Sequence, residues 1–210
     1  MFTPFEAYFG HVEKLGGNGW LRVRFDDGLV WPIPEFLRVK VNKTGDRESF
    51  QVLEGRMAGK TATVKKKGWE WTSWDWDRSY FEQSVHLGKG CPHTGSASVT
   101  FYRLTERLEV TGLGTFNAIT DTRNPTPLGS FDLEIPYEPH PGGGYYTSDS
   151  KYAKTWFRVG HSGDRFLHPG RISAGCITVT DTRQWDKIYQ HLIVSRKDDQ
   201  SIGTVKVVDR

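Results

Sequence analysis

The stretch "RFLHPGRISAGCITV" (residues 165–179) decides how the second half of this chain is interpreted. It places a cysteine directly after Ser-Ala-Gly and eight residues beyond the histidine of a His-Pro-Gly. A thiolate attacks carbonyl carbon, so a catalytic cysteine needs a base or a positive neighbour to lower its pKa from about 8.5. His168 and His161 precede Cys176 and are candidates for that base. The alternative is a small buried residue at the start of an ordinary strand, because free cysteine is among the most buried residue types.

Gly175 and Ser173, which precede Cys176, support the interpretation of Cys176 as a nucleophile. Gly175 permits backbone geometry that is closed to other residues, so that amide N–H groups can converge on a developing oxyanion. Ser173 is placed to orient an imidazole or a backbone carbonyl. The segment therefore predicts either a nucleophile with an oxyanion site or a plain buried strand.

Composition indicates a β-rich globular protein. The 210 residues allow one large domain or a small domain joined to a medium one. Aromatic residues make up 13%, with eight Trp and 23 Gly, a mixture that favours strands, tight turns and stacking surfaces. A net charge of +3 and one basic run, "KKKG" (residues 65–68), do not predict nucleic-acid binding. No apolar run has membrane length, and the first residues, "MFTPFEAYFGHVEKLGG", lack the pattern of an export signal.

The first part of the chain predicts a small SH3-like or barrel-like β domain over residues 1–85. Turn signals "GGNG" and "FDDG" separate short strands, and the prolines of "WPIPE" confine that segment to a sheet edge or a bend. The stretch "WEWTSWDWD" (residues 69–77) alternates aromatic and polar residues and predicts a strand with one aromatic face. That face is either a packing strip, which we favour, or a sugar-stacking surface. Residues 86–96, "HLGKGCPHTGS", are rich in turn formers and predict a linker.

Residues 97–210 predict a second, mainly β domain with one helix. Longer alternating runs occur in "ASVTFYR", "RLEVTGLG" and "SFDLEIP", and "GTVKVV" returns as a final strand. Asp181 or Thr182 is available as the N-cap of an amphipathic helix. Its apolar positions at helical spacing are Trp185, Ile188, Tyr189, Leu192 and Ile193.

The order of two segments, "NPTPLGSFDLEI" and then "RFLHPGRISAGC", resembles the L,D-transpeptidase catalytic-domain family (YkuD-like). In that family a T-P-x-G-x-[FY] segment precedes a His and then an [ST]-x-G-C nucleophile motif, and the resemblance covers residues 97–195. It implies a β-rich enzyme that attacks peptidoglycan stem peptides through a thioester. The resemblance thus implies an L,D-carboxypeptidase or L,D-transpeptidase, including exchange of a D-amino acid, that requires neither cofactor nor metal.

By this resemblance Cys176 is the nucleophile, Gly175 contributes to the oxyanion site and Ser173 belongs to the motif. We favour His168 as the base, because "RFLHPG" reproduces a family pattern of a hydrophobic strand followed by His-x-Gly, whereas His161 lies in an expected hairpin turn. His161 stays the alternative base, because its separation from the cysteine is nearer that of common family members.

Two family positions differ in this chain. Ala174 stands where a second His is frequent, and Thr178 stands where an Arg helps hold a substrate carboxylate. Arg171 is a candidate substitute for that Arg. The Gly- and aromatic-rich segment "EPHPGGGYYTSDSKY" (residues 138–152) is a candidate lid or substrate wall, with Tyr145 and Tyr146 as substrate-binding residues. An exposed arginine and an ordinary mobile connection are the alternatives.

Two other functions are weighed against the enzyme. One is a non-catalytic cell-wall-binding module with a degenerate catalytic domain. The other is a metal site made from His161, His168 and Cys176, which lacks a second close cysteine or carboxylate at ligand spacing.

The resemblance also implies where the protein acts and with what. Its partners are peptidoglycan stem peptides, in the bacterial periplasm or cell wall. Because no signal peptide is visible, we expect export by another route or release from a longer precursor. An antibacterial effector with the first domain as adaptor fits this, and its candidate partners are an immunity or delivery protein.

Overall fold

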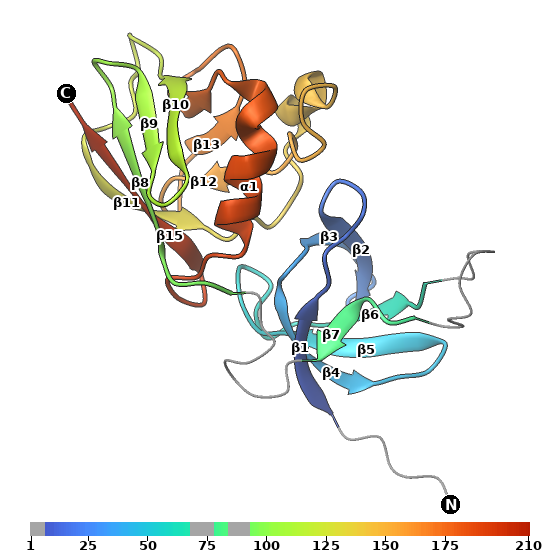
Figure 1. The fold of residues 1–210 in the computed structure, drawn as a ribbon. Coiled ribbons are helices and arrows are strands. Elements are labelled where there is room, and N and C mark those ends of the chain that lie inside the picture. Colours follow the sequence, from blue (N-terminus) through green and yellow to red (C-terminus); the bar gives the residue numbers. More distant parts are fainter. Residues whose placement is uncertain (1–6, 68–77, 84–92) are drawn as a thin grey trace, which may run out of the picture. The chain divides into compact units, whose positions relative to one another are not determined.

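The computed structural model describes residues 7–67, 78–83 and 93–210. The chain divides into two compact units, Met1–Pro92 and His93–Arg210 (Figure 1). The aromatic stretch at residues 69–77 and Cys91 fall outside the described residues. Strands dominate both units, and the mainly β fold predicted from composition is therefore confirmed.

The described part of the first unit forms one antiparallel sheet of seven strands, in the order β3-β2-β6-β5-β4-β1-β7. The strands are β1 (Tyr8–Val12), β2 (Trp20–Phe25), β3 (Val30–Pro34), β4 (Arg38–Lys43), β5 (Arg47–Val52), β6 (Thr61–Lys65) and β7 (Phe81–Gln83).

The sheet of the first unit curls into a nearly closed barrel around an apolar interior. Alternate residues of β2 are buried, while Arg22 and Arg24 between them are exposed. The prolines of β3 lie at the sheet edge, as expected for residues that lack a backbone donor. The N–H of Phe36 donates to the carbonyl of Val12 at 2.8 Å, which joins the end of β3 to β1. The small barrel-like domain predicted from the turn signals is confirmed.

The described part of the second unit forms a sheet of eight strands, in the order β11-β15-β8-β9-β10-β14-β13-β12. Only the pairs β8–β15 and β13–β14 are parallel. The strands are β8 (Ala97–Tyr102), β9 (Arg107–Val110), β10 (Gly114–Ile119), β11 (Gly129–Glu134), β12 (Phe157–Arg158), β13 (Phe166–Pro169), β14 (Ile177–Val179) and β15 (Ser201–Val208).

This second sheet also closes on itself. An antiparallel bridge joins Leu133, on β11, to Val159, just after β12. The N–H of Gly160 donates to the carbonyl of Asp132 at 2.7 Å, so the two outer strands of the sheet meet. Strand β13, which contains His168, pairs with β14, which begins one residue after Cys176.

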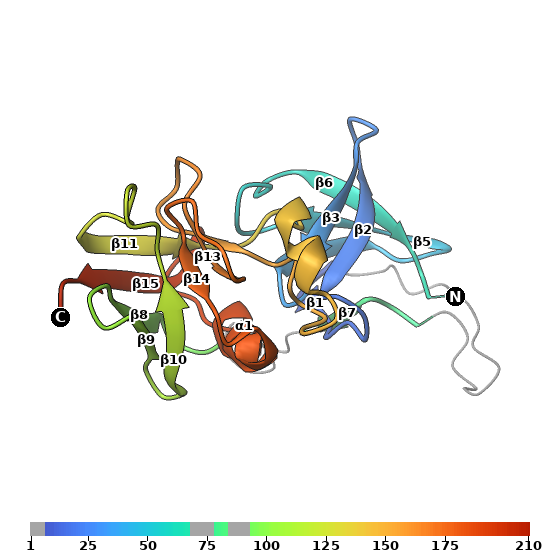
Figure 2. The same cartoon turned by 90° about the horizontal axis from the view of Figure 1, so that it is seen from above.

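The predicted amphipathic helix is confirmed as α1 (Trp185–Ile193), which covers one side of the second sheet (Figures 1 and 2). All five of its predicted apolar residues are buried. Two 3-10 helices, η1 (Pro141–Tyr146) and η2 (Thr182–Gln184), complete the described helices of this unit.

The predicted N-cap of the helix is wrong. The cap position is Gln184, because η2 precedes α1. The carboxylate of Asp181 instead accepts hydrogen bonds from the backbone and side chain of Asn117, at 2.7 and 3.0 Å. The hydroxyl of Thr182 donates to Asp149 at 2.8 Å. Both predicted capping side chains therefore make long-range hydrogen bonds instead, to β10 and to the segment after η1.

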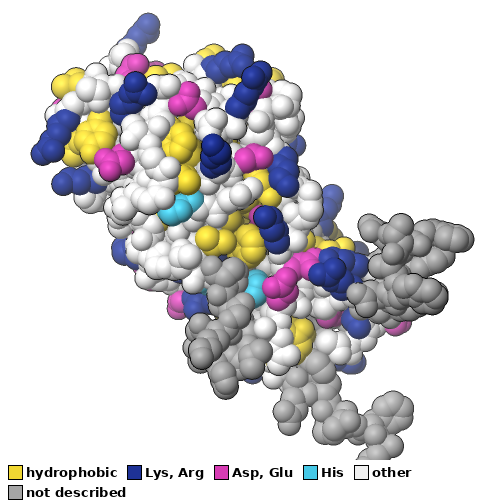
Figure 3. Space-filling view, viewed as in Figure 1, with side chains coloured by type: hydrophobic (Ala, Val, Ile, Leu, Met, Phe, Trp, Pro, Cys, Tyr) yellow, Lys and Arg dark blue, Asp and Glu magenta, His cyan; other side chains and the backbone are white. Residues whose placement is uncertain are grey.

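Within the described residues, no helix has both the length and the apolar character needed to cross a membrane. The face drawn in Figure 3 mixes cationic and acidic side chains, in line with the small net charge of +3.

Candidate active site around Cys176

The two motif segments meet in the second unit. The hydroxyl of Thr126, in "NPTPLG", donates to the carbonyl of Gly175 at 2.8 Å. Asn124, from the same segment, donates through its amide to the carbonyl of Ala174 at 3.3 Å. Arg165 also donates to the carbonyl of Gly175. Segments that lie about fifty residues apart in sequence therefore hold one turn, the turn that presents Cys176.

The local sequence explains the shape of this turn. Gly175 has a φ of +114°, a region that favours glycine. A Cβ at this position would lie 2.7 Å from the carbonyl oxygen of Asn124, so a larger residue would displace the turn. The hydroxyl of Ser173 accepts from the N–H of Gly175 at 3.2 Å and donates to the carbonyl of Cys176 at 2.8 Å. Ser173 thus orients a backbone carbonyl, one of the two functions expected of it.

Cys176 is a free cysteine with 9% of its surface exposed. Its Sγ lies 3.7 Å from the carbonyl of Asp164. Burial raises the pKa of the thiol, while the backbone N–H of Phe166 and the nearby charge of Arg165 oppose that rise. The thiol is therefore mainly protonated near neutral pH and needs a base before it can attack a carbonyl.

Cys176 lines a cavity of about 380 Å³ in the second unit. The wall is mostly aromatic and acidic. Its lining residues are Glu134, Ile135, Pro136, Tyr137, Glu138, His140, Trp156, Arg158, Asp164, Phe166, Ala174 and Cys176. A volume of this size fits one small ligand or the end of a longer one.

His168 is buried on β13, one strand away from Cys176. Its Nδ1 lies 2.9 Å from the carbonyl of Pro169, and its Nε2 lies 3.1 Å from the hydroxyl of Thr178. A carbonyl only accepts, so the neutral ring carries its proton on Nδ1, and Nε2 accepts from Thr178. Burial lowers the pKa of His168 to about 4, which keeps the ring neutral near pH 7. Among the described residues, no hydrogen bond joins His168 to Cys176.

An aromatic stack connects His168 to the cavity that Cys176 lines. The ring of His168 stacks on Trp156 with centroids 3.8 Å apart, and Trp156 stacks on His140 at 3.5 Å. Trp156 and His140 both line the cavity. The register pairs His168 with Thr178, and Cys176 immediately precedes the strand that carries Thr178.

The other predicted site residues lie outside the cavity lining. The Nε2 of His161 lies 3.2 Å from the hydroxyl of Ser201 and 3.4 Å from Asp132. Arg171 donates through its backbone to the hydroxyl of Tyr146 at 3.1 Å. Tyr145 is 87% exposed. The structure therefore brings Cys176, Gly175 and Ser173 together in one turn and links His168 to the cavity only through Trp156. His161, Arg171, Tyr145 and Tyr146 do not line that cavity.

Sequence reasoning missed several residues of the cavity wall. His140 accepts from the N–H of Gly142 at 3.1 Å through its Nδ1, which directs its other ring nitrogen away from that turn. Arg158 lies 3.2 Å from Glu134 and donates to the hydroxyl of Tyr137 at 3.0 Å. The segment of residues 138–152, which the sequence indicated as a candidate substrate wall, contains His140. The sequence therefore indicated this part of the cavity wall, although not the residue itself. Trp156 and Arg158 lie in a strand-like run with no distinguishing motif.

Thr178 occupies the position where the resemblance implied an arginine. Its buried hydroxyl binds the Nε2 of His168 rather than facing the cavity lining. Thr178 thus contacts His168 and does not line the cavity.

Among the described residues, no group of three or more His, Cys, Asp or Glu side chains is arranged to hold a metal ion. The hypothetical metal site of His161, His168 and Cys176 is not assembled, since His161 contacts Asp132 and Ser201 and His168 contacts Pro169 and Thr178.

Comparisons with solved structures find L,D-transpeptidases. The chain is similar to a crystal structure of Mycobacterium tuberculosis L,D-transpeptidase 1, with a TM-score of 0.36 and 18% identity, over 54% of this chain and 59% of that one. It is also similar to an L,D-transpeptidase from Mycobacterium tuberculosis H37Rv, with a TM-score of 0.36 and 11% identity, over 95% and 98% of the two chains. No protein-family model and no curated protein matches the chain.

Proposed function

We propose that the second unit is a cysteine enzyme that cleaves or exchanges an amide bond of peptidoglycan stem peptides through a thioester. The observation that carries the proposal is the position of the Cys176 thiol, in the wall of a cavity and at a turn held by Thr126 and Ser173. A buried strand residue would need neither the positive φ of Gly175 nor a cavity in front of its thiol.

Activation of the thiol is the first step. Burial raises the pKa of Cys176, so a base must remove its proton. We assign this role to His168, whose Nε2 carries the free electron pair. To accept the thiol proton, Nε2 must first give up its hydrogen bond with the hydroxyl of Thr178. This requires the side chain of His168 to move. The backbone N–H of Phe166 and the charge of Arg165 favour the thiolate that results.

Acyl transfer follows from these positions. The Sγ of Cys176 attacks the carbonyl between an L-centre and a D-residue, and the carbonyl oxygen becomes an oxyanion. The backbone N–H of Cys176 is the donor we assign to it, because the N–H of Gly175 is occupied by Ser173. The C–N bond then breaks, and the imidazolium returns its proton to the leaving amine. Water or an acceptor amine attacks the thioester, loses its proton to His168 and releases Cys176.

We propose removal or exchange of a terminal D-amino acid as the main outcome. A cavity of about 380 Å³ lies at the small end of the range for ligand sites. Crosslinking needs room for a second stem peptide beside the thioester, whereas hydrolysis or exchange needs only water or one amino acid.

For location, we propose an antibacterial effector that acts on the cell wall, with the first unit as adaptor. Directing the protein to the periplasm of a test bacterium should stop growth, while the same protein kept in the cytoplasm should not. Equal growth in both cases, with active protein present, would contradict this.

One observation favours a second candidate, a cell-wall-binding module that has lost catalysis. His168 has both ring nitrogens in hydrogen bonds and none to Cys176. Thiol labelling separates the candidates. A working site gives a Cys176 that a substrate-like acyl donor converts to a thioester, visible as a mass increase on that residue, whereas a degenerate site gives none.

The main experiment incubates the full chain with purified tetrapeptide muropeptides, with and without a free D-amino acid, and analyses the products by mass spectrometry. We expect tripeptides or exchanged tetrapeptides with the native protein and unchanged substrate with Cys176→Ala. Crosslinked dimers as the dominant product would show that the enzyme is a transpeptidase and not a carboxypeptidase or exchange enzyme. No product from either protein would refute the proposal that the second unit is an enzyme.

A further inference from the structure

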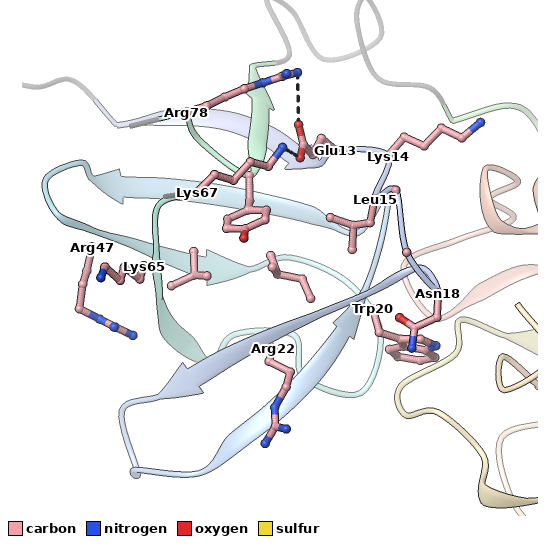
Figure 4. Close-up of a pocket in the computed structure, with 15 residues that line it drawn as sticks. Glu13, Lys14, Leu15, Asn18, Trp20, Arg22, Arg47, Lys65, Lys67 and Arg78 are labelled. Carbon is pink, nitrogen blue, oxygen red and sulfur yellow. Dashed lines mark ion pairs between the residues drawn. The ribbon is translucent and has the colours of Figure 1, made fainter. Parts of the chain in front are cut away.

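A second cavity lies entirely within the first unit and has no part in the chemistry above. It measures about 880 Å³ (Figure 4). Fifteen of the described residues line it, of which six are cationic and one is acidic. The cationic residues are Lys14, Arg22, Arg47, Lys65, Lys67 and Arg78.

Most of this positive charge has no acidic partner in the part of the chain that the structure describes. Glu13, the acidic residue, is buried and is paired with Lys67 and, at 3.6 Å, with Arg78 (Figure 4). The remaining four cations have no carboxylate partner among the described residues. The guanidinium of Arg47 is held by the hydroxyl of Thr63 at 3.2 Å, which fixes its position and leaves its charge in place. Uncompensated cations around a hollow attract an anionic ligand.

The cavity opens where two neighbouring strands separate. Strands β2 and β6 pair only at Arg24–Thr63 and Phe25–Ala62, although both strands continue beyond these positions. Asp26 N–H donates to the carbonyl of Thr61 at 3.1 Å. In an antiparallel ladder, hydrogen-bonded pairs recur every second residue, so the next such pair would be Arg22 with Lys65. That pair is not formed among the described residues. We call the gap between residues 20–23 of β2 and residues 64–65 of β6 the seam.

The seam therefore offers two kinds of contact at once. The backbone N–H and C=O groups of Arg22 and Lys65 are directed into it by the alternation of the strands, and no described residue pairs with them. The side chains of the same two residues are exposed cations at its rim. Leu21 and Val64 are buried at its base, and Trp20 lies beside it (Figure 4).

We propose that the seam binds an extended, acidic segment of a partner polypeptide. A peptide backbone pairs with the free strand edges of Arg22 and Lys65, as in other cases of strand addition. Carboxylates on one side of that peptide meet the surrounding Lys and Arg side chains, and apolar residues on the other side meet Leu21 and Val64. A phosphodiester chain satisfies the cations but has no donor for the strand carbonyls, so the strand edges favour a peptide. This assignment is independent of the activity proposed for Cys176.

The test uses the full chain and a fluorescent peptide of alternating Glu and Val, long enough to fill one strand of about five to six residues. Matched probes are the same peptide with Lys in place of Glu, and single-stranded oligothymidylate. We expect the acidic peptide to bind, with an affinity that falls as salt is added, and the lysine peptide not to bind. Amide hydrogen exchange at Arg22 and Lys65 should slow when the acidic peptide is bound.

Variants locate the site. Arg22→Gln combined with Lys65→Gln should weaken binding about tenfold. Arg24→Gln is the matched control, since Arg24 is exposed on the same strand but does not line the cavity, and should weaken binding less than about twofold. Arg22→Glu with Lys65→Glu reverses two of the six cationic charges and should weaken binding of the acidic peptide more than the Gln pair does. Unchanged thermal unfolding of each variant shows that it is folded.

Three outcomes would overturn the proposal. Equal weakening by Arg24→Gln would mean non-specific attraction to a basic protein. Tighter binding of oligothymidylate than of the acidic peptide, with no slowing of exchange at Arg22 and Lys65, would identify a phosphodiester site. Absence of binding by all three probes at low salt would remove the site altogether.

Discussion

The two units enclose cavities of opposite character. The cavity of the first unit measures about 880 Å³, and the described residues that line it include six cations and one carboxylate. The cavity of the second unit measures about 380 Å³ and is lined by three carboxylates, one arginine, four aromatic or histidine rings and the thiol of Cys176. The charged lining of the larger cavity consists mainly of exposed cationic side chains. The smaller one is lined by the thiol of Cys176 together with aromatic and acidic side chains.

The difference shows what each kind of cavity requires from the fold. Long cationic side chains attract an anion without a precisely fixed backbone. The residues that line the first cavity can therefore lie near the ends of strands. A nucleophile needs its backbone fixed, and the second cavity supplies this through Thr126, Ser173 and the left-handed Gly175. We therefore expect substitutions around Cys176 to have large effects on chemistry and substitutions around the first cavity to affect binding only.

The largest effect is expected from Cys176→Ala. Loss of the thiol removes the nucleophile and should abolish turnover of muropeptides, while the volume change is small and the fold should remain intact. Cys91→Ala is the matched control and should have nearly full activity, because Cys91 lies in the linker expected from sequence and outside the two motif segments. Muropeptide turnover and far-UV circular dichroism provide the two measurements. Retained activity in Cys176→Ala would sink the assignment and leave the second unit without a catalytic group.

The next largest effect is expected from His168→Ala. Loss of a positioned proton-transfer group usually lowers a rate by about 10² to 10⁴. His161→Ala should have a much smaller effect, because the ring contacts Asp132 and Ser201. Steady-state rates on the same muropeptides measure both. The reverse ranking would identify the histidine with the longer spacing as the base.

The sequence was sufficient for much of the fold. Strict alternation along β2 and β8 and the helical spacing from Trp185 to Ile193 depend on nearest neighbours, so they could be predicted locally. The N-cap was wrong because Asp181 and Thr182 found partners far away in sequence, Asn117 and Asp149. Local rules hold where local contacts decide the outcome.

The candidate site was only partly predictable for the same reason. Cys176, Gly175 and Ser173 are adjacent in sequence, and their motif is visible without a structure. His140 and Arg158 reach the cavity from different segments, and only the closure of the sheet brings them there. The basic cavity was hidden as well, because Arg22, Arg47 and Lys65 lie on three strands and no charge run joins them.

A moderate effect is expected from acid on the second unit. His168 has a pKa of about 4 in the folded protein and about 6.5 unfolded, so below pH 6.5 the unfolded chain binds a proton that the folded one does not. Stability is therefore full above pH 6.5 and falls by about 3 kcal/mol as the pH drops to about 4. In the first unit, burial also lowers the pKa of His11, but the carboxylate of Glu82 opposes that shift. The second unit should thus lose more stability.

Hydrogen exchange resolved by residue, at neutral pH and at about pH 4.5, measures both units in one sample. His168→Phe keeps a ring against Trp156 and removes the titration, so it should flatten the pH dependence of the second unit. His161→Gln serves as the matched control. An equal loss of protection in the native protein and in His168→Phe would show that another group controls acid unfolding.

The smallest effect is expected from Thr178→Val, which nearly preserves shape and removes one hydroxyl. The Nε2 of His168 then stays buried without a donor, which should cost about 1–3 kcal/mol of unfolding free energy. The lost bond stabilised the neutral ring, so the pKa of His168 should rise and the acid limb of the rate profile should move to higher pH. Thr178→Ser keeps the hydroxyl and should leave that limb in place, although it loses a methyl group. If both variants move the limb alike, packing against the methyl group, rather than the hydrogen bond, sets the protonation of His168, and Thr178 has no positioning role in catalysis.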